Sequence, residues 1–171
     1  VEKVYDRLLA KDRITADHKA SIMALYKGST DYADLSDVDM VIEAVFERLD
    51  VKRGVFEELD KVMKPTAVLA SNTSYIDINH ISSATRRADQ VLGLHFFSPA
   101  NIMKLLEIVV PKGVADDVVA TGFALGKRLG KVPVRAGNST GFIGNRILGK
   151  YGMCAAHMMA DGATPYEIDA A

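Results

Sequence analysis

Short apolar segments rich in β-branched residues alternate with amphipathic helical segments between residues 40 and 136. A short apolar run bounded by turn residues is typical of a strand that is buried on both faces. When such strands alternate with helices, the crossover connections place the strands parallel and the helices on the faces of the sheet. The alternation therefore predicts an α/β domain with a mostly parallel sheet.

The apolar periodicity also bounds the individual elements. The helix at 49–63 carries Val55, Phe56 and Leu59 on one stripe, and Pro65 ends it. We expect further helices at 76–83 and 115–129, buried strands at 40–45 and 67–71, and further strands at 90–96, 105–110 and 131–135.

Helical patterns precede and follow this domain. Residues 1–11 are apolar at helical spacing, and a second helical pattern begins at Thr15, a predicted N-cap, and stops at Gly28. After a turn-rich hinge at 137–141, residues 142–160 have the periodicity of a mostly buried helix. The order threonine then proline predicts a last short helix over 164–169. We place a domain boundary between residues 136 and 137.

Composition excludes several classes of protein. The 171 residues are 49% hydrophobic and 25% charged, which is the balance of a soluble globular chain. A net charge of -1 lacks the basic excess that binds nucleic acid, and no apolar run approaches the roughly 20 residues that span a bilayer. Cys154 is the single cysteine, which excludes a disulfide framework within the chain. We expect a cytoplasmic protein with no metal, membrane or nucleic-acid partner.

Ligands of open α/β sheets bind at the carboxyl ends of the strands, so the polar residues there are candidates for chemistry. Glu43 and Glu47 flank an apolar triplet at one strand end, where they could equally be solvated turn residues. The segment 71–74 consists of four small polar residues, a composition that is also typical of turns and helix caps. Asn145 and Arg146 begin the helix after the hinge, where capping would explain them without catalysis.

A histidine at the end of one predicted strand and a glutamate inside the next form the strongest candidate pair. Glu107 interrupts an apolar run, and a charge buried there needs a partner. His95 on the adjacent strand could be that partner, and a carboxylate that orients an imidazole is the arrangement of a general base. Lys104 is the competing partner, in which case the pair would be a simple ion pair.

Taken together, five segments resemble the NAD-dependent 3-hydroxyacyl-CoA dehydrogenase family in order and spacing: 41–47 (VIEAVFE), 71–74 (SNTS), 93–99 (GLHFFSP), 103–107 (MKLLE) and 141–146 (GFIGNR). The resemblance implies a Rossmann-like NAD-binding domain over 1–136, followed by the start of a helical dimerisation domain over 137–171. It implies NAD as cofactor, an acyl-CoA substrate, a homodimer, and oxidation of the 3-hydroxyl of a 3-hydroxyacyl-CoA as in fatty acid β-oxidation, or the reverse reduction.

The resemblance also implies roles for particular residues. His95 would be the general base, oriented by Glu107, and Ser74 and Asn145 would bind the substrate oxygen. The cofactor would be bound by Glu47, Lys52, Asn72 and Ser98, although the family often has asparagine at the position of Ser98.

The sequence contains no Gly-x-Gly-x-x-Gly fingerprint joining a strand to a helix, although the family begins with one. We therefore expect the chain to be an internal segment whose Rossmann-like sheet is incomplete. Two alternatives stay open. One is a related β-hydroxyacid dehydrogenase, and the other is a catalytically silent oligomerisation or scaffold module that uses 142–160 as a partner-binding helix.

Overall fold

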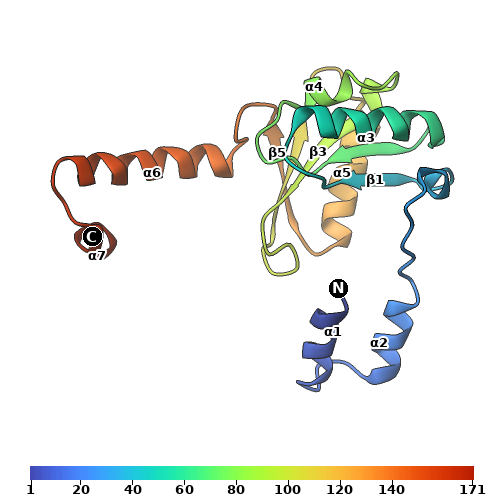
Figure 1. Cartoon of the computed structure of the whole chain (residues 1–171), viewed down its shortest axis with the longest axis horizontal. Helices are drawn as coiled ribbons and strands as arrows, with labels where there is room; N and C mark the ends of the chain where they lie inside the picture. Colours follow the sequence, from blue (N-terminus) through green and yellow to red (C-terminus); the bar gives the residue numbers. More distant parts are fainter. The chain divides into compact units, whose positions relative to one another are not determined.

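The computed structural model describes all residues from 1 to 171. It divides into two compact units, Val1–Asp34 and Leu35–Ala171, and Figure 1 labels their elements. The predicted domain boundary after residue 136 lies within the second unit and stays a prediction.

The first unit is a pair of short helices, α1 (Glu2–Leu9) and α2 (Ala16–Met23). Thr15 caps α2 as predicted, because its hydroxyl accepts a hydrogen bond from the backbone N–H of His18 at 3.1 Å. The ammonium of Lys19 on α2 lies 3.2 Å from the carboxylate of Glu2 on α1. Both predicted helices are confirmed.

A five-stranded sheet forms the centre of the second unit. Three of its four strand pairings are parallel, and only the pairing of the third and fourth strands is antiparallel. The predicted mostly parallel α/β sheet is therefore confirmed. The strands lie side by side in chain order: β1 (Met40–Glu43), β2 (Val68–Ser71), β3 (Val91–Phe96), β4 (Leu105–Val110) and β5 (Val132–Gly137).

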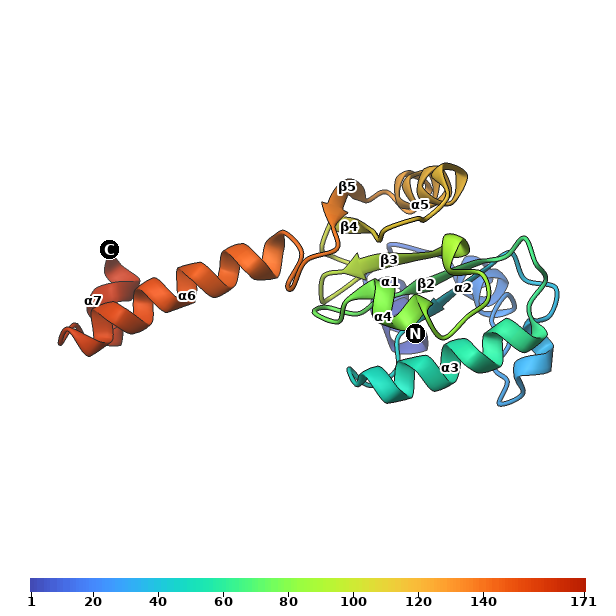
Figure 2. The ribbon, with the colours of Figure 1, turned by 90° about the horizontal axis from the view of Figure 1, so that it is seen from above.

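Helices cover both faces of this sheet, as Figure 2 shows. Helices α3 (Leu49–Val62) and α4 (Ile78–Ser82) pack on one face, and α5 (Asp116–Arg128) packs on the other. Two 3₁₀ turns, η1 (Tyr32–Leu35) and η2 (Ala88–Gln90), lead into β1 and β3. The side chains buried between the sheet and helices α3 and α4 include Phe56, Leu69 and Ile78. Those buried between the sheet and α5 include Leu92, Leu94 and Ile108.

Glycine is required where β3 passes closest to its neighbours. A Cβ on Gly93 would lie 2.7 Å from the Cβ of Val109 on β4 and 3.1 Å from the Cδ1 of Ile78 on α4. Because a larger residue would push these elements apart, Gly93 sets how closely β3 and β4 pack. These are the strands that carry His95 and Glu107.

Two predictions about burial are wrong. The strand at 40–45 ends at Glu43 and forms the edge of the sheet, so Ile42 is 39% exposed. The helix at 142–160 begins at Gly144, as α6 (Gly144–Ala160), and none of its residues is buried. Its apolar stripe is exposed because no element of the chain covers it: Ile147 is 65%, Leu148 62% and Tyr151 75% exposed. Periodicity identifies the helix but cannot identify what covers it.

The last helix, α7 (Pro165–Ala170), begins as predicted. Thr164 is its N-cap, Pro165 occupies the first helical position, and Glu167 completes a capping box. No helix in the structure combines the length and the apolar character that crossing a membrane requires.

Candidate active site

The antiparallel pairing of β3 and β4 places His95 directly opposite Glu107. Their side chains point to the same face of the sheet, and the Nδ1 of His95 lies 2.7 Å from the Oε2 of Glu107. Both residues are buried, His95 at 4% and Glu107 at 0% exposed. The predicted contact is confirmed, and the competing ion pair with Lys104 does not form.

The second oxygen of Glu107 accepts two backbone hydrogen bonds from the start of α6. The N–H groups of Ile143 and Gly144 donate to Oε1 at 3.0 and 2.8 Å. The two residues before them, Gly141 and Phe142, have left-handed backbones, with φ of 73° and 49°. A left-handed phenylalanine is uncommon and costs free energy, so the contacts of this turn must hold it in place. Glu107 therefore binds both the imidazole and the first turn of α6.

Two aromatic rings pack beside the imidazole of His95. The ring centroid of Phe97 lies 4.6 Å away and that of Phe142 lies 5.5 Å away. These rings pack against the imidazole, which is 4% exposed, and a buried hydrogen bond to Glu107 is stronger than one in water. Our sequence reasoning missed both rings, although Phe97 is only two residues from His95 and could have been found from strand alternation.

The segment that follows β2 forms hydrogen bonds next to His95 and to the start of α6. The Oδ1 of Asn72 accepts a hydrogen bond from the backbone N–H of Phe96 at 2.9 Å, next to His95. The backbone carbonyl of Ser74 accepts one from the Nδ2 of Asn145 at 3.4 Å. The structure thus brings Ser74 and Asn145 together, as their shared predicted role requires.

Glu47 fastens the same segment from the other side. Its Oε1 accepts hydrogen bonds from the hydroxyl of Thr73, from the N–H of Ser74 at 2.9 Å and from the N–H of Tyr75 at 3.2 Å. Burial alone would raise the pKa of Glu47, but these hydrogen bonds and the nearby ammonium of Lys52 together hold that pKa below its ordinary value. Glu47 is accordingly a charged, partly exposed acceptor at the end of the sheet.

Lys52 lies between two carboxylates and is only 1% exposed. Its Nζ is 2.8 Å from the Oε1 of Glu43 and 3.2 Å from the Oε2 of Glu47. Glu43 also accepts hydrogen bonds from the N–H of Val45 and the hydroxyl of Ser71, both at 2.7 Å. This arrangement leaves Lys52 no exposed surface for a ligand, so any influence on a cofactor must pass through Glu47.

The sequence reasoning missed the pairing of Glu43 with Lys52. Helical spacing could have revealed it, because Lys52 lies four residues before Phe56 and seven before Leu59 and is therefore on the buried stripe of α3. A lysine on such a stripe needs a buried acceptor.

The remaining predicted cofactor residue, Ser98, lies apart from these contacts. It is exposed, on the segment that follows β3, and its side chain makes no hydrogen bond within the chain. The predicted roles of Ser98, Asn72, Ser74 and Asn145 stay predictions.

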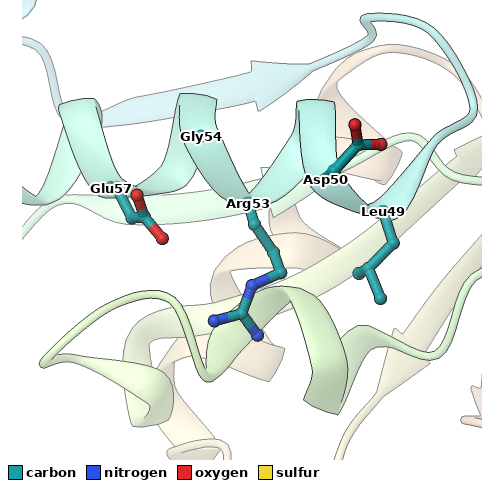
Figure 3. Close-up of a pocket in the computed structure, with 5 residues that line it drawn as sticks. All are labelled: Leu49, Asp50, Arg53, Gly54 and Glu57. Atoms are coloured by element: carbon teal, nitrogen blue, oxygen red, sulfur yellow. The ribbon is translucent and has the colours of Figure 1, made fainter.

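A surface pocket of about 570 Å³ lies on α3 away from these residues (Figure 3). Its one long cation is already engaged, because Arg53 donates hydrogen bonds to the backbone carbonyl of His80 and the hydroxyl of Ser83. The pocket contains none of the predicted site residues, since it is lined by Leu49, Asp50, Arg53, Gly54 and Glu57.

Comparison with known families gives two adjoining matches. Residues 1–140 match the family model described as "3-hydroxyacyl-CoA dehydrogenase, NAD binding domain", and residues 141–171 match the one described as "3-hydroxyacyl-CoA dehydrogenase, C-terminal domain". The two models therefore cover the whole chain.

Comparison with individual proteins agrees with this. The chain is 48% identical over 147 residues to the peroxisomal bifunctional enzyme of Danio rerio, covering 86% of this chain and 20% of that protein. It is 44% identical over 170 residues to the peroxisomal fatty acid beta-oxidation multifunctional protein AIM1 of Arabidopsis thaliana, covering 99% of this chain and 23% of that protein. The chain thus spans about a fifth of the length of these curated relatives.

Among solved structures, the chain resembles the (S)-3-hydroxybutyryl-CoA dehydrogenase PaaH1 from Ralstonia eutropha. The TM-score is 0.94 at 40% identity, over 97% of this chain and 59% of that one. A 3-hydroxybutyryl-CoA dehydrogenase from Escherichia coli matches with a TM-score of 0.91 at 34% identity, over 95% of this chain and 34% of that one. These likenesses confirm the Rossmann-like fold expected from the sequence.

Proposed function

Because the chain belongs to the 3-hydroxyacyl-CoA dehydrogenase family, we propose that it performs the dehydrogenase chemistry of that family. The reaction oxidises the 3-hydroxyl of a 3-hydroxyacyl-CoA to a ketone with NAD, or runs in reverse on a short-chain 3-ketoacyl-CoA. The observation that carries this proposal is the buried pair in which the Nδ1 of His95 lies 2.7 Å from the Oε2 of Glu107.

The residues present fit NAD at the carboxyl ends of β1 and β2, where open α/β sheets bind dinucleotides. Glu47 is 39% exposed there, and its Oε2 and the partly exposed side chain of Asn72 border the same strand ends. These two residues would hold the nicotinamide half of the cofactor, with Ser98 on the neighbouring segment. NAD, when bound, accepts the hydride that leaves the carbon bearing the hydroxyl.

His95 supplies the proton transfer in this scheme. A charged carboxylate only accepts hydrogen bonds, so the contact with Glu107 requires the proton of His95 on Nδ1. The lone pair of Nε2 then takes the hydroxyl proton of the substrate as the hydride leaves, and Glu107 stabilises the imidazolium that results. In the reverse direction Nε2 returns the proton to the forming alkoxide.

In the proposed function, Ser74 and Asn145 would bind the reacting oxygen. The Nδ2 of Asn145 donates a hydrogen bond to the backbone carbonyl of Ser74 at 3.4 Å, which supports this role because it brings the two residues together after β2. Donors fixed in this way stabilise negative charge that develops on the substrate oxygen.

The proposal also includes a partner for the chain, which is a second copy of itself. The exposed apolar residues Ile147, Leu148 and Tyr151 of α6 support association with a second copy into a homodimer. Sedimentation of the chain and of an Ile147→Glu variant tests this, because a dimer formed through α6 should dissociate in the variant.

A cytoplasmic location stays our proposal, and two relatives carry the word peroxisomal in their names.

The test of the activity is consumption of NADH with acetoacetyl-CoA. We expect consumption that requires the CoA ester, because the family acts on acyl-CoA, and we expect both ligands to raise the melting temperature. Consumption with free 3-ketobutyrate but not with its CoA ester would favour a related β-hydroxyacid dehydrogenase. Concentration-dependent association without any stabilisation by either ligand would favour a scaffold.

A further inference from the structure

The hinge between β5 and α6 contains a side chain that no predicted function uses. The amide of Asn138 reaches across 60 residues of sequence to the first turn of α4, where its Oδ1 accepts a hydrogen bond from the N–H of Ile78 at 3.0 Å. Its Nδ2 donates to the Oδ1 of Asp77 at 2.6 Å. Both polar atoms of the Asn138 amide are therefore bound to α4.

Asp77 is the last residue of the segment that carries Ser74. It is the N-cap of α4, because its Oδ1 also accepts a hydrogen bond from the N–H of Asn79 at 2.7 Å. The other end of the segment is held by Glu47, through Thr73 and Ser74. The segment 72–77 is thus held at one end by Glu47, in the loop between β1 and α3, and at the other end by the hinge.

The same hinge continues directly into the contacts of the catalytic pair. Phe142 is 3% exposed and belongs to the same core cluster as Ile78. The next two N–H groups, those of Ile143 and Gly144, donate to Glu107. Within seven residues the chain therefore binds α4 through Asn138, the core through Phe142, and the carboxylate that orients His95.

We propose that Asn138 is a positioning residue, which holds the segment 72–77 and the first turn of α6 in a fixed relation to the His95–Glu107 pair. The contacts stand independently of the proposed function, on which only the roles given to His95, Glu107, Ser74 and Asn145 rest. A residue that merely capped α4 would make the same bonds to Asp77 and Ile78 but would leave the hydrogen bonds of Glu107 unaffected.

Asn138→Asp tests this with almost no change in shape. It places a second carboxylate against Asp77, and two carboxylates in contact cannot both be ionised without strong repulsion. We expect amide hydrogen exchange of Ile78, Ile143 and Gly144 to become at least about tenfold faster at neutral pH, because the bonds of Asn138 are lost. Thr140→Asp is the matched control, since it adds the same charge to an exposed position of the hinge and should leave all three amides at their wild-type rates.

The double variant Asp77→Asn, Asn138→Asp exchanges the two side chains and can rebuild every bond. Asn is as good an N-cap as Asp, its amide can donate to the new carboxylate, and that carboxylate can still accept from Ile78. We expect wild-type exchange at all three amides in this variant, even if the single variant does not fold. Faster exchange of Ile143 and Gly144 in the exchanged pair would overturn the proposal, as would a single variant in which only Ile78 exchanges faster.

Turnover provides a second readout that distinguishes this proposal from the proposed function. With NADH and acetoacetyl-CoA we expect Asn138→Asp to lower kcat about tenfold or more and the exchanged pair to restore it, because misplacement of Ser74 and Asn145 affects the reacting oxygen. A wild-type chain without turnover would contradict the proposed function, whereas the exchange results would still decide the role of Asn138.

Discussion

Two buried glutamates, Glu107 on β4 and Glu43 on β1, face similar environments and have different partners. Glu107 is 0% and Glu43 is 3% exposed, and each accepts hydrogen bonds at both of its oxygens. The partner of Glu107 is an imidazole, which has a second ring nitrogen able to accept or donate a hydrogen bond. The partner of Glu43 is the ammonium of Lys52, which is itself 1% exposed and also held by Glu47.

Under the proposed function, this difference separates the pair suited to proton transfer from the pair suited to structure. Both pairs bear the cost of burying charge, and neither leaves a buried polar side-chain atom without a hydrogen-bond partner. Only His95 combines such a partner with a second ring nitrogen that remains for a substrate. Glu43 and Lys52 instead fix the ends of β1 and β2 and hold Glu47 in place. A buried carboxylate is thus common to both pairs, and the second ring nitrogen of His95 separates them.

Replacing the imidazole should give the largest effect and should act on activity alone. We expect His95→Gln to lower kcat/KM for acetoacetyl-CoA roughly 10²- to 10⁴-fold, the usual contribution of a general acid or base. The glutamine amide can still donate to Glu107, so the free energy of unfolding should change by no more than about 1 kcal/mol. Steady-state kinetics and urea unfolding of the same preparation measure both. A variant that keeps wild-type kcat/KM would assign the proton transfer to another residue.

Replacing the ammonium should give the opposite result, a loss of stability. Lys52→Met leaves the carboxylates of Glu43 and Glu47 without their cation, and breaking a buried ion pair costs about 3 to 5 kcal/mol. Urea unfolding measures this loss. The matched control is Lys61→Met, which removes an exposed ion pair to Glu58 and should leave the urea midpoint almost unchanged. Equal losses of stability in the two variants would show that burial does not strengthen the contribution of Lys52.

A smaller effect should come from crowding the aromatic side of the catalytic pair. A Cβ on Gly144 would lie 2.7 Å from the Cζ of Phe97, whose ring packs against His95. We expect Gly144→Ala to lower the free energy of unfolding by about 1 to 3 kcal/mol and to reduce kcat. Gly152→Ala on the same helix meets no atom within 4 Å and should raise stability by up to about 1 kcal/mol. Thermal melts that shift in the same direction for both would show that the contact with Phe97 is unimportant.

The smallest effect should appear in the pH dependence of stability. The pKa of Glu47 is lowered in the folded protein, so its contribution to stability is fully present above the pKa of the unfolded chain and is lost as pH falls through the folded value. Glu47→Gln should therefore lower stability at neutral pH, where this contribution is fully present, and should flatten the decline of stability as pH falls through the acid range. Urea midpoints measured across this range test it, and an unchanged decline would mean that Glu47 is not held by Thr73, Ser74 and Lys52.

The sequence predicted the elements of the sheet and one of the two buried pairs. Apolar periodicity is a local property, so it identified all five strands, α3, α5 and the caps at Thr15 and Thr164. The contact of His95 with Glu107 was also accessible, because a lone charge in an apolar strand must find a partner on a neighbouring strand.

Other features depend on contacts that no local pattern encodes. The pairing of Glu43 with Lys52 requires α3 to return against the end of β1, and the bonds of Asn138 join residues 60 positions apart. The prediction that Ile147 and its neighbours on α6 are buried was wrong for the same reason, because an apolar stripe does not reveal which element, if any, covers it. Each of these features depends on packing between segments that are distant in the sequence.

We propose that Glu107 acts through His95, and a double-mutant cycle on turnover of NADH with acetoacetyl-CoA tests this. Four proteins are compared: wild type, His95→Gln, Glu107→Gln and the double variant. If Glu107 orients the imidazole and stabilises its charged form, the double variant should be no slower than His95→Gln alone. Losses that multiply in the double variant would show that the two residues act independently, and would contradict the account.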